Sequence, residues 1–230
     1  MSASVQALLL HLQQAGTTGV PRPLGFDELG RESVSYVEGQ VWNDPLPELV
    51  WRESTLLAAA ALLRGLHDAT VGFRPPANAR WMLAMPADLP VEVVCHNDFA
   101  PYNVVFAEDR PVGVIDWETS APGARVWDVA YAAYRFVPLS RDAPPALLDA
   151  RVQARRLAAF CGGYGLGEPD RAVLLATVAR RVSALRELIL AGAASGDPPF
   201  AAALAQGHAE HYAADLADLA DSASALGECL

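Results

Sequence analysis

Side chains that could do chemistry are densest near the middle of the chain. The apolar run 91–95 is followed by four polar residues, His96, Asn97, Asp98 and Asn103. A later apolar run, 111–115, is followed by two carboxylates, Asp116 and Glu118. Carboxylate and amide oxygens suit a hard cation such as Mg2+. A carboxylate can equally take a proton from a hydroxyl group. The residue types therefore allow a metal site or a general base, and both require these side chains to meet in space.

The segment between the two groups is typical of a β-hairpin that would bring them together. Two β-rich runs, 104–106 and 111–115, flank the polar turn Ala107-Glu108-Asp109-Arg110. The expected register pairs Phe106 with Pro111. It places Asn103 opposite Val114, and Asp116 one step past the same open end. The first polar group and Asp116 would then converge at one end of the hairpin.

The order and spacing of these residues carry a family resemblance. His96-x-Asp98-x-x-x-x-Asn103, followed by Ile115-Asp116-Trp117-Glu118, resembles the catalytic loop and metal-binding motif of kinase-like phosphotransferases. The Asp-aromatic-Glu sequence is similar to that of the aminoglycoside phosphotransferase and choline kinase branch. A hairpin with ordinary polar turns is the alternative reading. The spacing, the hairpin and the second Asp together favour the kinase-like one.

The resemblance implies a role for each residue of the motif. Asp98 would position and deprotonate an acceptor hydroxyl, and His96 would brace the loop without transferring protons. Mg2+ would be held against the phosphates of ATP, or of another nucleoside triphosphate, by a set of three residues: Asn103, Asp116 and, directly or through water, Glu118. Asp128 would brace the catalytic loop, although an acid in the first turn of a helix also suits the helix dipole.

Composition indicates a globular protein with one large domain or two small lobes. The chain has 230 residues, of which 52% are hydrophobic and 19% charged, which allows a sizeable core and argues against disorder. No apolar run approaches the roughly 20 residues of a membrane span, and the N-terminus is a poor signal peptide. The chain has three cysteines, Cys95, Cys161 and Cys229. Their spacing matches neither a disulfide framework nor a set of metal ligands. We therefore expect a protein of the reducing cytoplasm with no membrane partner.

The net charge further limits the classes of binding partner that this chain is expected to have. A formal charge of −10 argues against nucleic acid. An acidic surface would attract cationic small molecules, or would serve only solubility. Three acids of the late helices could face a cationic acceptor: Glu210, Asp215 and Asp218. A charged helix face is, however, usually just solvated. The partner expected is a small molecule with a hydroxyl group, and the sequence leaves its identity and the oligomeric state open.

The rest of the chain predicts an α+β, protein kinase-like fold. A truncated small N-lobe, a helix plus two strands, would precede a large, mainly helical C-lobe that carries the catalytic hairpin. The expected boundaries are 1–39 for the partial N-lobe, 40–48 for a connector and 49–230 for the C-lobe, with the catalytic loop at 95–118 and a helical acceptor-side region at 127–220. Helices are expected at 5–14, 49–67, 127–136, 145–161, 169–191 and 198–219, with strands near 20–26 and 32–37.

Two single-residue features of this scheme are expected from the sequence. Asp44, followed by a proline, would cap the helix expected at 49–67. His67, near the end of that helix, is interpreted as a satisfied core residue. By resemblance, the strand end and hinge that contact an adenine ring correspond to Tyr36, Val37 and Glu38.

Several parts of a nucleotide site are missing from the sequence. Kinase-like enzymes carry a Gly-rich turn over the phosphates, a lysine on a following strand and a helix Glu that pairs with it. This chain contains no lysine at all, and its first helix contains no Glu. Activity of this chain is therefore the open question.

Three explanations fit these gaps. The missing strands could be encoded upstream. A compact phosphotransferase could use Arg22 or Arg31 for the phosphates. A catalytically impaired protein could bind a small molecule and act in immunity or sequestration. A metal-dependent phosphatase or nuclease is a weaker alternative, because it does not explain the HxDxxxxN arrangement.

Overall fold

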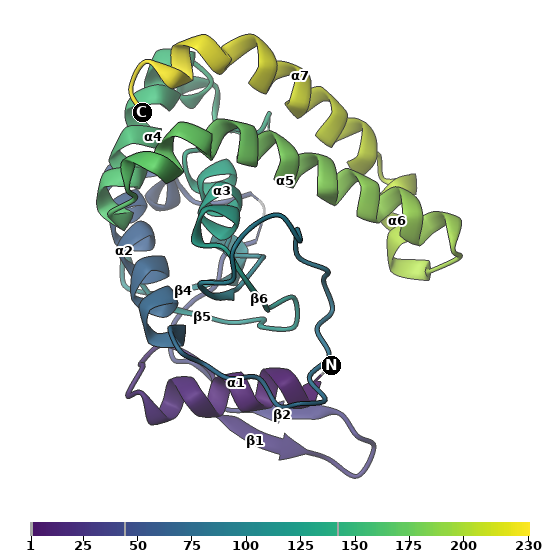
Figure 1. The fold of residues 1–230 in the computed structure, drawn as a ribbon. Coiled ribbons are helices and arrows are strands. Elements are labelled where there is room, and N and C mark those ends of the chain that lie inside the picture. The colour runs from purple at the N-terminus through teal and green to yellow at the C-terminus, as the bar shows by residue number, and fades with distance from the viewer. Residues whose placement is uncertain (1, 44, 142) are drawn as a thin grey trace.

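The computed structural model describes residues 2–43, 45–141 and 143–230, so the helix cap expected at Asp44 lies outside the described residues. Figure 1 shows α1 and the β1–β2 pair at one end of the molecule and the helices α4 to α7 at the other. The central part between them contains α2, α3, the β4–β5 hairpin and the β3–β6 pair. No helix of the described residues has the length and apolar character needed to cross a membrane.

The first segment folds as a helix against two strands. Helix α1 (Ser2–Gln14) buries one apolar face, and β1 (Pro23–Phe26) pairs antiparallel with β2 (Glu32–Val34). The predicted face is the buried one: Val5, Leu8, Leu9 and Leu12. The Gln6 amide joins helix and strands, since it donates to Glu32 Oε1 (2.7 Å) and accepts from the Gly25 N–H (3.1 Å). A two-stranded pair is marginal alone, so this helix is what holds it.

The hairpin β4 (Val104–Ala107) and β5 (Arg110–Val114) forms as predicted, but its register at the open end is shifted by one residue. Phe106 pairs with Pro111 as expected. Beyond that pair, a bulge places two residues of β5 against one of β4, so Val114 lies opposite Val104. The expected pairing of Asn103 with Val114 is therefore wrong. Asn103 O instead accepts the N–H of Ile115 (2.9 Å).

The first segment is joined to both strands of this hairpin. Gln40 forms an antiparallel bridge with Phe106 in which both N–H groups donate across the pair, each at 2.8 Å. On the other strand, the Val114 N–H donates to Gly19 O (2.8 Å). Glycine is required at this crossing, because a Cβ on Gly113 would lie 2.4 Å from Gly19 O. The β4–β5 hairpin thus has a partner on each side.

Helices build the second part of the chain around a continuous core. Helix α2 (Glu53–Thr70) follows a 3-10 turn at Glu48–Trp51, and α3 (Arg125–Phe136) is buried over almost its whole length. The remaining helices are α4 (Ala150–Tyr164), α5 (Glu168–Ala194), α6 (Pro198–Ala205) and α7 (His208–Gly227). Short 3-10 turns stand at Pro101–Asn103 and Pro145–Leu147.

Several boundaries differ from those expected. Helices α2 and α4 begin four and five residues later than expected, each after a 3-10 turn. The second strand ends at Val34, three residues early, and the helix expected at 198–219 is two helices separated at Gly207, whose φ is +82°. The segment after Glu118, where no strand was expected, contains β6 (Ala121–Gly123), which pairs with β3 (Val93–Cys95). Each difference depends on a contact or backbone angle that a local hydrophobic pattern does not encode.

Candidate functional site

A buried carboxylate, Asp128, organises the loop that carries the polar cluster. Its Oδ2 accepts the N–H of His96 (2.7 Å) and a bond from His67 Nε2 (3.0 Å), and its Oδ1 accepts the N–H of Asn97 (2.8 Å). Burial works against ionisation, but the His67 bond, nearby imidazoles and the backbone donor together hold the pKa of Asp128 below its usual value. The side chain is fully buried, so its contribution is to fix the loop.

His67 and His96 both have structural partners. His67 is buried, and its Nδ1 meets Tyr164 Oη at 2.7 Å, which confirms its interpretation as a satisfied core residue. His96 Nδ1 accepts the N–H of Asp98 (3.2 Å), and its Nε2 bonds to the carbonyl of Ile115 (3.0 Å). A carbonyl can only accept, so Nε2 carries the proton and the ring is neutral. His96 thereby ties the loop to the segment that holds Asp116.

Two residues of the site have left-handed backbone angles. Asn97 has φ +66° and Asp116 has φ +61°, a region in which Asn and Asp are enriched among non-glycine residues. Asn97 is held there by its side-chain bond to Thr119 O (3.0 Å) and by Arg181, whose Nη2 donates to Asn97 O (2.6 Å). The strain at Asn97 is therefore balanced by contacts on both its side chain and its backbone.

Asp98 and Asn103 are in direct contact. Asn103 Nδ2 donates to Asp98 Oδ2 (2.8 Å) and to the Asp98 carbonyl (3.0 Å). With the nitrogen used in this way, Oδ1 is the Asn103 atom left to meet a ligand. Asp116 directly follows Ile115, the partner of Asn103 at the hairpin end. The structure therefore brings Asp98 and Asn103 together and places Asp116 at the same end of the hairpin.

Glu118 lies in a field of negative charge. Partial burial raises its pKa, and the charges of three neighbours raise it further: Asp116, Asp98 and Glu32. The side chains of Asp116 and Glu118 are exposed. Among the described residues no three His, Cys, Asp or Glu side chains form a metal-holding group by themselves. Two carboxylates and an amide oxygen suit Mg2+, which keeps several waters and takes further ligands from substrate phosphates.

The residues expected at an adenine ring lie after the strand and not in it. Tyr36, Val37 and Glu38 follow β2, which ends at Val34. Tyr36 is exposed, and its hydroxyl donates to Gly39 O (3.1 Å). A Cβ on Gly39 would lie 2.6 Å from Phe106 O, so these three residues directly precede the contact with the hairpin.

Tyr102 was not among the residues predicted from the sequence, although it lies inside the motif, directly before Asn103. Its hydroxyl donates to Asp98 Oδ1 (2.7 Å) and meets the hydroxyl of Tyr131 at 2.7 Å. Burial, together with the neighbouring Tyr131 and Asp98, raises the pKa of Tyr102 well above its usual value. The hydroxyl therefore stays protonated and occupies one side of the Asp98 carboxylate.

Comparison with known proteins finds similarity to phosphotransferases. Residues 77–175 match the model of the phosphotransferase enzyme family. A trifolitoxin immunity protein from Rhizobium leguminosarum bv. trifolii is 34% identical over 177 residues, which cover 74% of this chain and 66% of that relative. The chain thus spans just under two thirds of the relative's length.

Two solved structures share the fold. A choline/ethanolamine kinase family protein from Mesorhizobium loti aligns with a TM-score of 0.63 and 17% identity over 99% of this chain and 83% of its own. The streptomycin-ATP-APH(2")-IIa ternary complex aligns with a TM-score of 0.53 and 15% identity over 91% and 82%. The predicted kinase-like fold, a small lobe of one helix and two strands before a large helical lobe, is confirmed.

Proposed function

We infer that this chain, a kinase-like protein whose residues 77–175 match the phosphotransferase enzyme family, transfers a phosphoryl group from ATP or another nucleoside triphosphate to a hydroxyl group of a small molecule. The observation that carries this proposal is the grouping of Asp98 and Asn103 in direct contact, with Asp116 following the residue that pairs with Asn103. Phosphoryl transfer depends mainly on positioning and charge neutralisation, and this is what a rigid set of oxygen ligands beside a carboxylate can supply.

Each residue of the group has a distinct role in the proposal. Asp98 receives the proton of the acceptor hydroxyl. Asn103 Oδ1 and Asp116 would hold Mg2+, with Glu118 as an additional or water-mediated ligand, and the ion would neutralise charge on the nucleotide phosphates. Asp128 and His96 hold the loop, as their hydrogen bonds to backbone groups indicate.

The nucleotide side of the proposal rests on residues 1–39 and the connector 40–48. Tyr36, Val37 and Glu38 are proposed as the adenine-facing stretch, because they directly precede the contact of Gly39 with the hairpin. Arg31 is paired with Asp27 (2.7 Å), which leaves Arg22 as the better arginine for phosphate contact. The ATP complex of a fold neighbour of 15% identity supports the proposal that a nucleotide binds here. The acceptor would enter from the helical side, residues 127–220.

A second function, binding without turnover, is favoured by one specific observation. Tyr102 already donates a hydrogen bond to Asp98 Oδ1, so an acceptor hydroxyl must displace it or share the carboxylate. The immunity protein that is 34% identical fits such a role, in which the chain sequesters a small toxic molecule. The two functions differ in whether nucleotide is consumed.

Isothermal calorimetry of ATP with Mg2+, followed by a radiolabelled phosphoryl-transfer screen of hydroxyl compounds, tests both. We expect Asp98→Asn to leave nucleotide binding intact and to lower transfer about 10²- to 10⁴-fold, the scale of a general base. Asp116→Asn should abolish the Mg2+ dependence of nucleotide binding. Asp109→Asn, at the exposed turn of the same hairpin, is the matched control and should behave as wild type.

The outcomes separate the candidates. Transfer that is unaffected in both site variants would exclude the mechanism. ATP binding without transfer to any compound would favour sequestration, and no ATP binding at all would remove the phosphotransferase proposal. Hydrolysis of ATP without an acceptor would favour the phosphatase-like alternative.

A further inference from the structure

The side chains next to Asp98 on its helical side are aromatic and cationic. Tyr102 leads from Asp98 to Tyr131, and burial raises the pKa of Tyr131, which keeps its hydroxyl protonated. The guanidinium of Arg135 lies over the ring of Tyr102 (5.4 Å to the centroid) and over that of Tyr134 (5.8 Å). One tyrosine ring therefore separates the cation of Arg135 from the carboxylate of Asp98.

Arg135 carries a positive charge that the protein does not neutralise. Within residues 2–43, 45–141 and 143–230, no carboxylate pairs with it, and its buried Nε has no hydrogen-bond partner. Burial works against its charge, yet the surrounding tyrosine oxygens raise the pKa of Arg135 above its usual value. Arg135 as a whole is partly buried. An anion would give its buried Nε an acceptor and its charge a counter-charge.

Arg135 lines a small inner space that shares two lining residues with a larger outer pocket. An inner space of about 20 Å³ is bounded by Leu46, Trp51, Tyr134, Arg135, Pro138, Ser140 and Ala143. That volume exceeds what one water molecule needs, so it can admit a small polar group. Leu46 and Trp51 also line a larger outer pocket of about 480 Å³, and the two spaces adjoin at these side chains.

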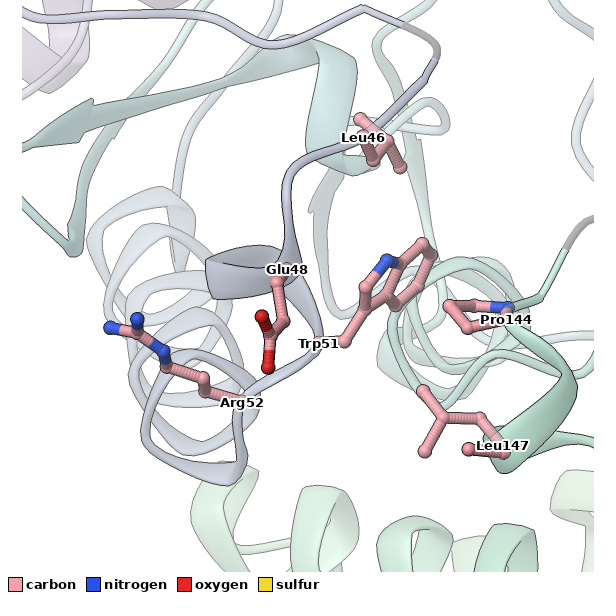
Figure 2. Close-up of a pocket in the computed structure, with 7 residues that line it drawn as sticks. Leu46, Glu48, Trp51, Arg52, Pro144 and Leu147 are labelled. Atoms are coloured by element: carbon pink, nitrogen blue, oxygen red, sulfur yellow. The ribbon is translucent and has the colours of Figure 1, made fainter.

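The outer pocket has mainly apolar walls. Figure 2 shows the Trp51 indole beside Leu46, Pro144 and Leu147. The carboxylate of Glu48, which also lines the pocket, lies on the other side of Trp51, and Arg52 points away. Such a pocket accepts an apolar or aromatic body, with polar contact limited to its rim. A ligand that fills both spaces would combine an apolar body with one anionic end.

Two of the three acids expected to attract a cationic acceptor are used elsewhere, whereas Glu210 is exposed. Asp215 is fully buried, where it accepts the Tyr134 hydroxyl and the N–H of Arg141 (3.0 Å). Asp218 receives both guanidinium donors of Arg141, at 2.6 and 2.9 Å. These two carboxylates join α7 to the segment after α3 and leave the cavity beside Arg135 without negative charge from them.

We propose that the small molecule bound by this chain carries a carboxylate or a similar anionic group, and that Arg135 is the residue that binds this group. The proposal rests on the proposed function in one respect only, namely that a hydroxyl of the same molecule reaches Asp98. Trp51 contacts the apolar body of the molecule. The chemical class is a hydroxy acid with an aromatic or aliphatic side chain, and not an aminoglycoside-like polycation.

Three probes of matched shape test the charge preference: 3-phenyllactate (anion), 3-phenyllactamide (neutral) and phenylalaninol (cation). Calorimetry on the full chain should show phenyllactate binding about tenfold or more tightly than the other two, since a hydrogen bond to a charged group contributes that much. Arg135→Gln should remove this advantage and leave amide binding unchanged, which also verifies that the variant is folded. Arg135→Lys should retain part of it, and Arg74→Gln, at an exposed arginine, should retain all of it.

The proposal is overturned if phenylalaninol binds as well as phenyllactate, if none of the three binds at millimolar concentration, or if Arg135→Gln binds phenyllactate like wild type. Adding ATP and Mg2+ separates this from the proposed function. Arg135-dependent binding without phosphoryl transfer would leave the anion site standing and remove the enzyme. Transfer to phenylalaninol but not to phenyllactate would do the reverse.

Discussion

Replacement of Asp128 by asparagine should cost more stability than any other single polar substitution proposed for this protein. The carboxylate accepts three hydrogen bonds, two on Oδ2 and one on Oδ1. Asparagine offers one oxygen and one NH2 group. If the NH2 replaces Oδ2 it faces the His96 N–H, and if it replaces Oδ1 it faces the Asn97 N–H. Either orientation sets a donor against a buried donor.

The magnitude follows from that geometry. His67 can adapt by moving its proton to Nδ1 and donating to the Tyr164 hydroxyl, so its contact survives. One backbone bond to a charged acceptor is lost, about 1.5–3 kcal/mol, and its N–H stays buried without a partner, about 1–3 kcal/mol. We therefore expect Asp128→Asn to lower the free energy of unfolding by about 2.5–6 kcal/mol.

Urea unfolding at neutral pH is the assay, with Asp68→Asn as control. Asp68 also joins α2 to α3, through Arg125 (2.8 Å), but it is half exposed, so its loss should cost less than about 1 kcal/mol. A loss below about 1 kcal/mol in Asp128→Asn would refute the reasoning. The pH dependence has a definite sign: because the folded-state pKa of Asp128 is lowered from 3.8, the difference between wild type and variant should persist above that pH and shrink only as pH falls below it.

Two further substitutions are informative. Tyr102→Phe frees Asp98 Oδ1 and should raise kcat/KM for a hydroxyl acceptor severalfold. Because Tyr131 loses a hydrogen-bond partner, the free energy of unfolding should fall by about 1–2 kcal/mol. Steady-state kinetics measure the first effect, and a tenfold fall in kcat/KM would contradict this prediction. Gly113→Ala places a Cβ 2.4 Å from Gly19 O and should lower Tm by several degrees or more, whereas Gly162→Ala, in open space on α4, should leave Tm unchanged or raise it. Equal melting temperatures for the two alanine variants would disprove the role of the crossing.

The sequence predicted the elements that are local and missed the contacts that are not. The hairpin and its flanking polar groups follow from alternating β-rich residues around one turn, and they lie where expected. The register at the open end was wrong because the bulge in β5 accommodates Gly113 against Gly19, a residue far away in the chain. No pattern within the hairpin carries that information.

The chemistry of the ligand side was equally hidden. Arg135 is an ordinary helix residue in the sequence, and only the packing of α3 against the catalytic loop brings its guanidinium over Tyr102. Asp215 and Asp218 looked available for a cation until their bonds to Tyr134 and Arg141 were located. Charge counts describe a surface, whereas the pairing of charges decides which of them a ligand can meet.

The attachment of the small lobe to both hairpin strands has a mechanical consequence. Rotation of residues 1–39 as one body would have to break the backbone hydrogen bond of Val114 with Gly19. The connector itself is held to the hairpin by the two bonds of Gln40 with Phe106. Under the proposed function, entry and exit of the nucleotide would therefore depend on movement of the β1–β2 pair itself, outward from Gly19 and Gly39. The β4–β5 hairpin, which Asp116 follows, would keep its position during this movement.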